Sequence, residues 1–271
     1  WSNVLVRGAG DPLLQFNNIY GSARDGIQIY EGGRGRYEDN RVHDNNGFEI
    51  NVYDNLEEAA TPLLLRNEVY KTEPSGHDIG IMVSNKSRAK LHGNKIRNCP
   101  SVGLYVKEFS NVTATANEFY NNGVGAIVTT EKSVRPREEE LIGSSTFEDY
   151  NEFFNNSVGL KVSDRAEAIV KNARFIRNGT GVLVDQGAKP SLEKINAFDN
   201  RSAGVTITGK RSNPKLTDCE IQGPQLKRPF RKLILDEENS ADKEITFRGN
   251  TFGANEEVKI TIDKTKQTAE I

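Results

Sequence analysis

Four carboxylates in the first part of the chain are of the residue type that acid–base catalysis needs. They are Asp25, Glu31, Glu49 and Asp54. Two such groups on one surface, one protonated and one ionised, form the acid and base of glycoside hydrolysis. Their spacing in the sequence does not fix the distances between them. We therefore assign no catalytic residue and weigh against an enzyme, while keeping a catalytic groove as an alternative.

One short motif resembles part of a known enzyme class. Gly76-His77-Asp78-Ile79-Gly80 is similar to the Gly-His-Gly element of polygalacturonases, but their Asn-Thr-Asp, paired-aspartate and Arg-Ile-Lys elements are missing from the sequence. The three histidines follow no metal-ligand spacing, and Cys99 and Cys219 lie far apart. We therefore predict no metal site and no cofactor.

The two cysteines also bear on the cellular location. A pair so widely separated excludes a disulfide framework and predicts reduced, buried thiols, which are typical of cytoplasmic or nuclear proteins. Five Asn-x-Ser/Thr sequons favour the alternative of a secreted protein. The sequons begin at Asn85, Asn111, Asn155, Asn178 and Asn200.

The charge balance limits the kinds of partner. The 36 Lys and Arg against 38 Asp and Glu leave a formal net charge of −2, so no long-range positive field is present to attract nucleic acid. No stretch approaches the roughly 20 apolar residues of a membrane-spanning helix. We predict a protein partner, with a glycan as the alternative, no nucleic acid and no membrane span.

An internal repeat positions these residues. An Asn-x-(Ile/Val/Phe) unit recurs with a basic period of about 23 residues and several insertions. Its apolar members are Ile19, Val42, Val69, Ile96, Phe119, Phe153, Phe175, Phe198, Ile221 and Phe252. Ala173 and Cys219 take the place of asparagine in two of the units. Identical amides on successive coils can bond to one another and to turn backbone.

Two further strands fit between successive units. Six or seven residues after the apolar member of most units, a glycine is followed by alternating aliphatic residues, as in Gly103-Leu104-Tyr105-Val106. A weaker strand, such as Ala89-Lys90-Leu91, precedes the next asparagine. Three strands per coil without helical periodicity predict an all-β fold, a right-handed parallel β-helix of about ten coils. Leucine-rich repeats share the period, but their leucine frame is missing.

The ends of the chain complete the predicted domain. Residues 1–271 are expected to form a single β-helix domain. The sequence begins inside a coil whose second strand is expected at Val4-Leu5-Val6, and earlier coils or a flanking domain are expected in front of Trp1. A last alternating strand, Val258 to Ile262, and a polar tail are expected to cap the open edge within residues 254–271.

Outward positions on the strands supply candidate partner-binding residues. The apolar member of each Asn-x-(Ile/Val/Phe) unit should point inward and the residue after it outward, which gives an aromatic-rich row on the outer surface. This row comprises Tyr20, His43, Tyr70, Arg97, Tyr120, Phe154 and Ile176. On the next strand Met82, Tyr105 and Ile127 form an apolar stripe of the kind that binds a partner. The alternatives are self-stacking of the row and coverage of the stripe by long insertions of the chain, the last of them at Gln222 to Glu244.

The repeat resembles one known family. Arg24 to Asn40 and Gly123-Val124-Gly125-Ala126-Ile127-Val128 are similar to the pectin-lyase-like repeats of F-box-only ubiquitin-ligase adaptors. The resemblance covers Val4 to about Phe252 and implies a β-helix that recruits substrates or acts as a scaffold. The zinc-binding tail of some members needs many Cys and His that are absent here.

Three functions follow as hypotheses. The first is a protein-interaction or scaffold β-helix, as in the substrate-recruiting region of a ubiquitin-ligase adaptor, which binds through Met82, Tyr105 and Ile127 and through the tyrosines of the aromatic row. The alternative is a carbohydrate-active or glycan-binding β-helix for an acidic polysaccharide. The third is a structural spacer.

Overall fold

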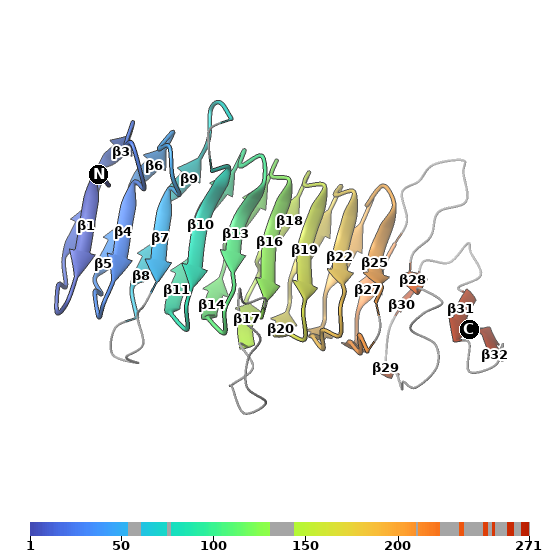
Figure 1. Ribbon diagram of the computed structural model, residues 1–271. Helices are drawn as coiled ribbons and strands as arrows, with labels where there is room; N and C mark the ends of the chain where they lie inside the picture. Colours follow the sequence, from blue (N-terminus) through green and yellow to red (C-terminus); the bar gives the residue numbers. More distant parts are fainter. Residues whose placement is uncertain are drawn as a thin grey trace.

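The computed structural model describes residues 1–53, 61–74, 77–130, 144–209 and 211–222, and beyond these the backbone of five further strands. The chain forms a right-handed parallel β-helix in which three sheets of ten strands each run along a rod (Figure 1). Each sheet takes every third strand in chain order, and all of these pairings are parallel. The predicted all-β fold is confirmed. None of the described segments forms a helix long and apolar enough to cross a membrane.

The three sheets are named A, B and C. Sheet A contains β1 (Val4–Arg7), β4 (Ile27–Tyr30), β7 (Ile50–Tyr53), β10 (Ile79–Ser84), β13 (Val102–Val106), β16 (Val124–Thr129), β19 (Val158–Ser163), β22 (Thr180–Val184), β25 (Ala203–Ile207) and β28 (Leu233–Leu235). Sheet B contains β2 (Leu13–Gln15), β5 (Arg36–Glu38), β8 (Leu63–Leu65), β11 (Arg88–His92), β14 (Asn111–Thr115), β17 (Ser144–Glu148), β20 (Glu167–Lys171), β23 (Ser191–Glu193), β26 (Lys215–Thr217) and β29 (Thr246–Arg248). Sheet C contains β3 (Asn18–Tyr20), β6 (Arg41–His43), β9 (Glu68–Tyr70), β12 (Lys95–Arg97), β15 (Glu118–Tyr120), β18 (Glu152–Phe154), β21 (Arg174–Ile176), β24 (Asn196–Phe198), β27 (Glu220–Ile221) and β30 (Thr251–Phe252).

The end of the chain differs in part from the expected polar tail. The strand expected near Val258 to Ile262 is present as β31 (Lys259–Ile262). It pairs antiparallel with β32 (Gln267–Glu270), which the sequence analysis had placed in the tail.

The interior is a continuous column of side chains from the alternate positions of each strand. Phe119, Phe153 and Phe175 stack in register on sheet C, with ring centroids 4.7 and 4.8 Å apart, and all three are fully buried. Such stacking follows from the parallel register, because equivalent residues of successive strands lie directly above one another.

One repeat unit was placed one residue out of register. The sequence analysis took Asn196 as the ladder asparagine and Phe198 as the inward residue. The structure instead pairs Phe175 with Ala197 and Ile176 with Phe198, so Ala197 is buried and Phe198 lies on the outer face. A shift of one residue exchanges the two faces of a strand. The larger apolar residue had been taken for the inward one.

The recurring asparagines form a buried ladder before sheet C, as predicted. The side-chain oxygen of Asn94 accepts hydrogen bonds from the backbone N–H and the amide group of Asn67, at 2.9 and 3.0 Å. The amide of Asn94 in turn donates to the Leu64 carbonyl at 2.9 Å and to Asn117 at 2.9 Å. The same pattern joins Asn40 to Asn67 and Asn117 to Asn151. Each amide therefore satisfies turn groups that would otherwise be buried without partners.

A second asparagine ladder, after sheet C, was missed by the sequence analysis. It consists of Asn122, Asn156, Asn178 and Asn200. Asn122 accepts a hydrogen bond from the backbone N–H of Cys99, and each of the other three accepts one from the backbone N–H of the asparagine before it in the ladder. The available signal was an asparagine two residues after the outward residue of sheet C in four successive coils, after Tyr120, Phe154, Ile176 and Phe198. Asn178 and Asn200 are fully buried, so a glycan on either side chain would be incompatible with this fold.

Both cysteines are buried and free, as predicted. Burial raises the pKa of the Cys99 thiol to about 12 and also raises the pKa of the Cys219 thiol. Because the thiolate is the reactive form, we expect neither thiol to react with iodoacetamide at pH 8 in the native protein, and both to react in urea. Mass spectrometry of the alkylated chain checks this result. Rapid native labelling of Cys99 would contradict the burial of its coil.

Candidate functional site

The carboxylates proposed as an acid–base pair do not share a surface. Glu49 is fully buried and forms an ion pair with the equally buried Lys71, with 2.8 Å between Nζ and Oε1. Lys71 also donates hydrogen bonds to the carbonyl oxygens of Asn45 and Gly47. Burial raises the pKa of the Glu49 carboxyl, while Lys71 and Asn45 oppose this shift. The prediction that Glu49 lines a catalytic groove is wrong, because the residue lies inside the β-helix.

The remaining members of that set are also unsuited to a pair. Asp25 is 8% exposed and accepts hydrogen bonds from the Phe48 backbone at 2.9 Å and from the Asn51 amide at 3.0 Å. Glu31 lies on an exposed turn with a positive φ of 50°, and Asp54 lies outside the described residues. In the polygalacturonase-like motif, His77 packs at a tilt against Phe48 with ring centroids 5.3 Å apart.

The aromatic row on the outside of sheet C is self-stacked. Tyr20 pairs with His43 at 5.2 Å and His43 with Tyr70 at 4.6 Å between ring centroids, and the guanidinium of Arg97 lies 4.0 Å above the Tyr70 ring. Further along, Tyr120 stacks on Phe154 at 4.7 Å. The predicted outward direction is confirmed. Since the ring faces contact one another, the row presents mainly ring edges to a ligand, which does not favour face-to-face stacking of sugars.

The apolar stripe on sheet A is less exposed than expected. Met82, Tyr105 and Ile127 are neighbours in register, but Met82 is only 5% exposed and the other two are half-buried. The prediction that Met82 is an exposed residue is therefore wrong. Partner binding by the other members of the stripe and by Tyr20, Tyr70 and Tyr120 stays a prediction.

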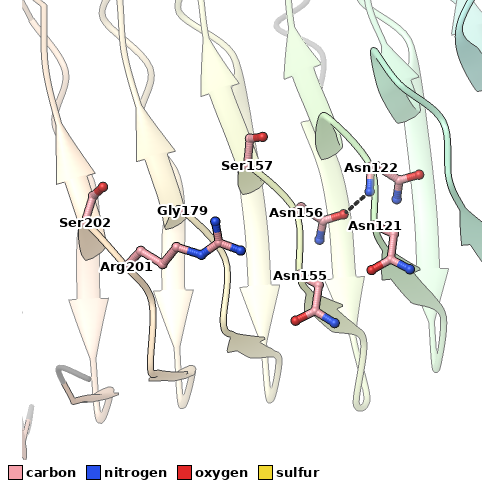
Figure 2. A pocket seen from close by; sticks show the side chains of 8 residues that line it. All are labelled: Asn121, Asn122, Asn155, Asn156, Ser157, Gly179, Arg201 and Ser202. Carbon is pink, nitrogen blue, oxygen red and sulfur yellow. Dashed lines mark hydrogen bonds between the residues drawn. The ribbon is translucent and has the colours of Figure 1, made fainter. Parts of the chain in front are cut away.

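A polar groove of about 490 Å³ lies at the corner where the chain passes from sheet C to sheet A. We call it the corner groove (Figure 2). It crosses four coils, and its lining is made of asparagines, serines, one glycine and one arginine. These residues are Asn121, Asn122, Asn155, Asn156, Ser157, Gly179, Arg201 and Ser202.

The turn geometry explains why these residue types line the corner groove. Asn121 and Asn155 have φ values of 55° and 56°, in the left-handed region that asparagine tolerates better than most residues. The next residue of each turn, Asn122 or Asn156, points inward and belongs to the second ladder. Gly179 has no side chain because a Cβ there would lie 2.3 Å from the Ser157 carbonyl oxygen. The groove is therefore deeper at Gly179, and asparagine side chains border it.

Arg201 supplies the cation of the corner groove. It is an extra residue in its turn, because Ile176 pairs with Phe198 and Thr180 with Ala203 on either side of it. Its backbone N–H donates to the Asn178 carbonyl at 2.8 Å, and its side chain extends across the coil of Gly179 (Figure 2). In the described part of the chain, its exposed guanidinium forms no ion pair or side-chain hydrogen bond. The same holds for the exposed amides of Asn121 and Asn155.

A second pocket of about 450 Å³ lies on the outer face of sheet A over the first coils. We call it the sheet-A pocket. Its lining includes Trp1, Ser2, Arg24, Gln28, Tyr30 and Tyr53. The sequence analysis singled out none of these residues as a binding residue, because only the parallel register brings positions 28, 30 and 53 together.

Comparison with known proteins identifies the family. A search of curated proteins found no match. Among solved structures, the A-module of mannuronan C-5 epimerase AlgE4 from Azotobacter vinelandii matches with a TM-score of 0.52 and 15% identity, over 93% of this chain and 76% of that one. The AlgE6 A-module from the same organism matches with a TM-score of 0.48 and 16% identity, over 94% and 84% of the two chains. The AlgE4 likeness shows the fold. A family model described as the right-handed beta helix region matches residues 2–137 and 134–271, and the chain belongs to that family.

Proposed function

We propose that the protein binds an acidic polysaccharide along the corner groove. The observation that carries this proposal is the guanidinium of Arg201, which has no ion-pair partner among the described residues and lies in a groove whose other exposed groups are amides and hydroxyls. Amides and hydroxyls both donate and accept hydrogen bonds, as a polyhydroxylated chain requires. A guanidinium recognises a carboxylate through two parallel hydrogen bonds.

The shape of the corner groove supports a chain-like ligand. Asn121, Asn155 and Arg201 lie on separate coils and follow the rod axis, so an extended polymer can contact several of them at once (Figure 2). The sugar chain named for the AlgE4 neighbour, mannuronan, belongs to the same ligand class. The chemistry of this groove therefore favours glycan binding over the protein-recruiting hypothesis.

Replacing Arg201 by glutamine is expected to weaken binding of a polyuronate oligomer by about tenfold or more, because hydrogen bonds to charged groups contribute about 1.5–3 kcal/mol. Isothermal titration calorimetry at low salt checks this result. Arg165→Gln is the control, since Arg165 is also an exposed arginine of a turn but lies outside the groove. Equal affinity of the wild type for a neutral oligomer would contradict the proposal.

The hypothesis of a ubiquitin-ligase adaptor has no support among the proteins that match this chain. The burial of Met82 removes one end of the predicted apolar stripe. A protein partner at Tyr105 and Ile127 stays a prediction that affinity capture with a Tyr105→Ser/Ile127→Ser variant would test.

A further inference from the structure

We propose that the sheet-A pocket is a second sugar-binding site, which holds a single sugar ring independently of the corner groove. The pocket lies on the first coils, whereas the corner groove lies on later ones. Its lining combines aromatic rings, an amide, a hydroxyl and a guanidinium, which is a different chemistry from that of the corner groove.

The floor of the pocket is a chain of hydrogen bonds. The Ser2 hydroxyl donates to Gln28 Oε1 at 2.9 Å, and Gln28 Nε2 donates to the Tyr53 hydroxyl at 2.7 Å. Tyr30 lies parallel to Tyr53, with ring centroids 5.1 Å apart and an interplanar angle of 2°. The amide and the two phenols are therefore fixed in place before a ligand arrives, which lowers the entropy cost of binding.

Two groups at the edge of the pocket are left for a ligand. Trp1 lines the pocket, and its indole is a large apolar plane. Arg24 is exposed, and within the described residues its guanidinium forms no ion pair or side-chain hydrogen bond. An aromatic plane beside convergent polar groups suits a ligand that has one apolar face and a hydroxylated edge.

A sugar ring has that combination, with C–H groups on one face and hydroxyl groups around its edge. A purely apolar ligand would bury the Gln28 amide without replacing its contacts to water, at a cost. A carboxylate on the ring would find Arg24 as its partner. We therefore expect the pocket to bind a uronate ring more tightly than a neutral one.

The test uses the fluorescence of Trp1, which is the only tryptophan of the chain. Titration of the full chain with galacturonate oligomers is expected to give a saturable change in tryptophan emission. The Arg201→Gln variant should keep this change, because its substitution lies in the other site. Loss of corner-groove binding in calorimetry and loss of the emission change are thus separate results, and either proposal can fail without the other.

Gln28→Leu is expected to raise the apparent Kd of the emission change about tenfold, because it breaks the hydrogen-bond chain under the ligand. Gln222→Leu, at an exposed position near the far end of the described coils, is the matched control. Tyr53→Phe keeps the ring stack and removes only the hydroxyl, which preserves the test if Gln28→Leu misfolds. Binding heat without any change in Trp1 emission, or unchanged Kd values in both variants, would overturn the proposal.

Discussion

Replacing Lys71 by methionine is expected to lower the free energy of unfolding by about 3–5 kcal/mol. The substitution leaves the carboxylate of Glu49 buried, without its partner at 2.8 Å. It also removes the hydrogen bonds from Nζ to the carbonyl oxygens of Asn45 and Gly47. Removing one member of a buried pair costs far more than the pair itself contributes, because the remaining charge has lost its hydration without compensation. Urea denaturation followed by circular dichroism measures the change.

A second substitution separates this explanation from simple loss of packing. Lys71→Met combined with Glu49→Gln removes both charges, and the new amide can still accept a hydrogen bond from Asn45. We expect the double variant to recover a large part of the lost stability. Arg174→Met, which breaks the exposed ion pair with Glu152 at 2.7 Å, should change stability by less than about 1 kcal/mol. If the double variant is as unstable as Lys71→Met, the isolated charge is not the cause.

Replacing Asn178 by leucine is expected to lower the free energy of unfolding by roughly 3–6 kcal/mol. The Asn178 oxygen accepts from the backbone and the amide of Asn156, both at 3.0 Å. Its amide donates to the Phe153 carbonyl at 2.9 Å and to Asn200 at 3.1 Å. Leucine has a similar volume but no polar atoms, so the variant leaves these buried groups without partners.

The control for this experiment is Asn46→Leu. Asn46 is exposed, and its side chain makes one long contact of 3.5 Å to the Ala23 carbonyl. Its replacement should change the unfolding free energy by no more than about 0.5 kcal/mol. Similar losses in the two variants would mean that the second ladder does not stabilise the coil. The slope of the unfolding free energy against urea concentration should be the same in both variants, which shows that their unfolded states are comparable.

Much of the fold follows from the sequence because a parallel β-helix repeats one local pattern. The period of the Asn-x-(Ile/Val/Phe) unit and the alternation in the second strand were enough to place the three sheets. The prediction failed at β24, where Phe198 was taken as inward, because a two-residue alternation gives no direction when both Ala197 and Phe198 are apolar. Only the hydrogen-bond register with β21 resolved that strand.

The candidate sites were less accessible to sequence reasoning for a physical reason. Residues of the corner groove, such as Asn155 and Arg201, come from different coils, and their alignment along the groove depends on the register between those coils. Glu49 was taken for a surface carboxylate. Glu49 directly precedes β7, whose first residue, Ile50, pairs with Ile27 and Ile81 on the two neighbouring strands. The burial of Glu49 therefore depends on the coils on both sides of it. Its partner Lys71 lies in the third coil, beyond the insertion that follows β7.

The sequence by itself determined the all-β repeat architecture, the first asparagine ladder, the outward direction of the aromatic row and the buried state of both thiols. These features depend on local periodicity and on residue type, which each coil carries in its own sequence. The tertiary structure alone decided that Glu49 and Lys71 are paired inside the rod, that the aromatic faces stack on one another, and that Arg201 lies in a polar groove. These features depend on the register between coils, which is set by backbone hydrogen bonds across the whole stack and not by any single repeat.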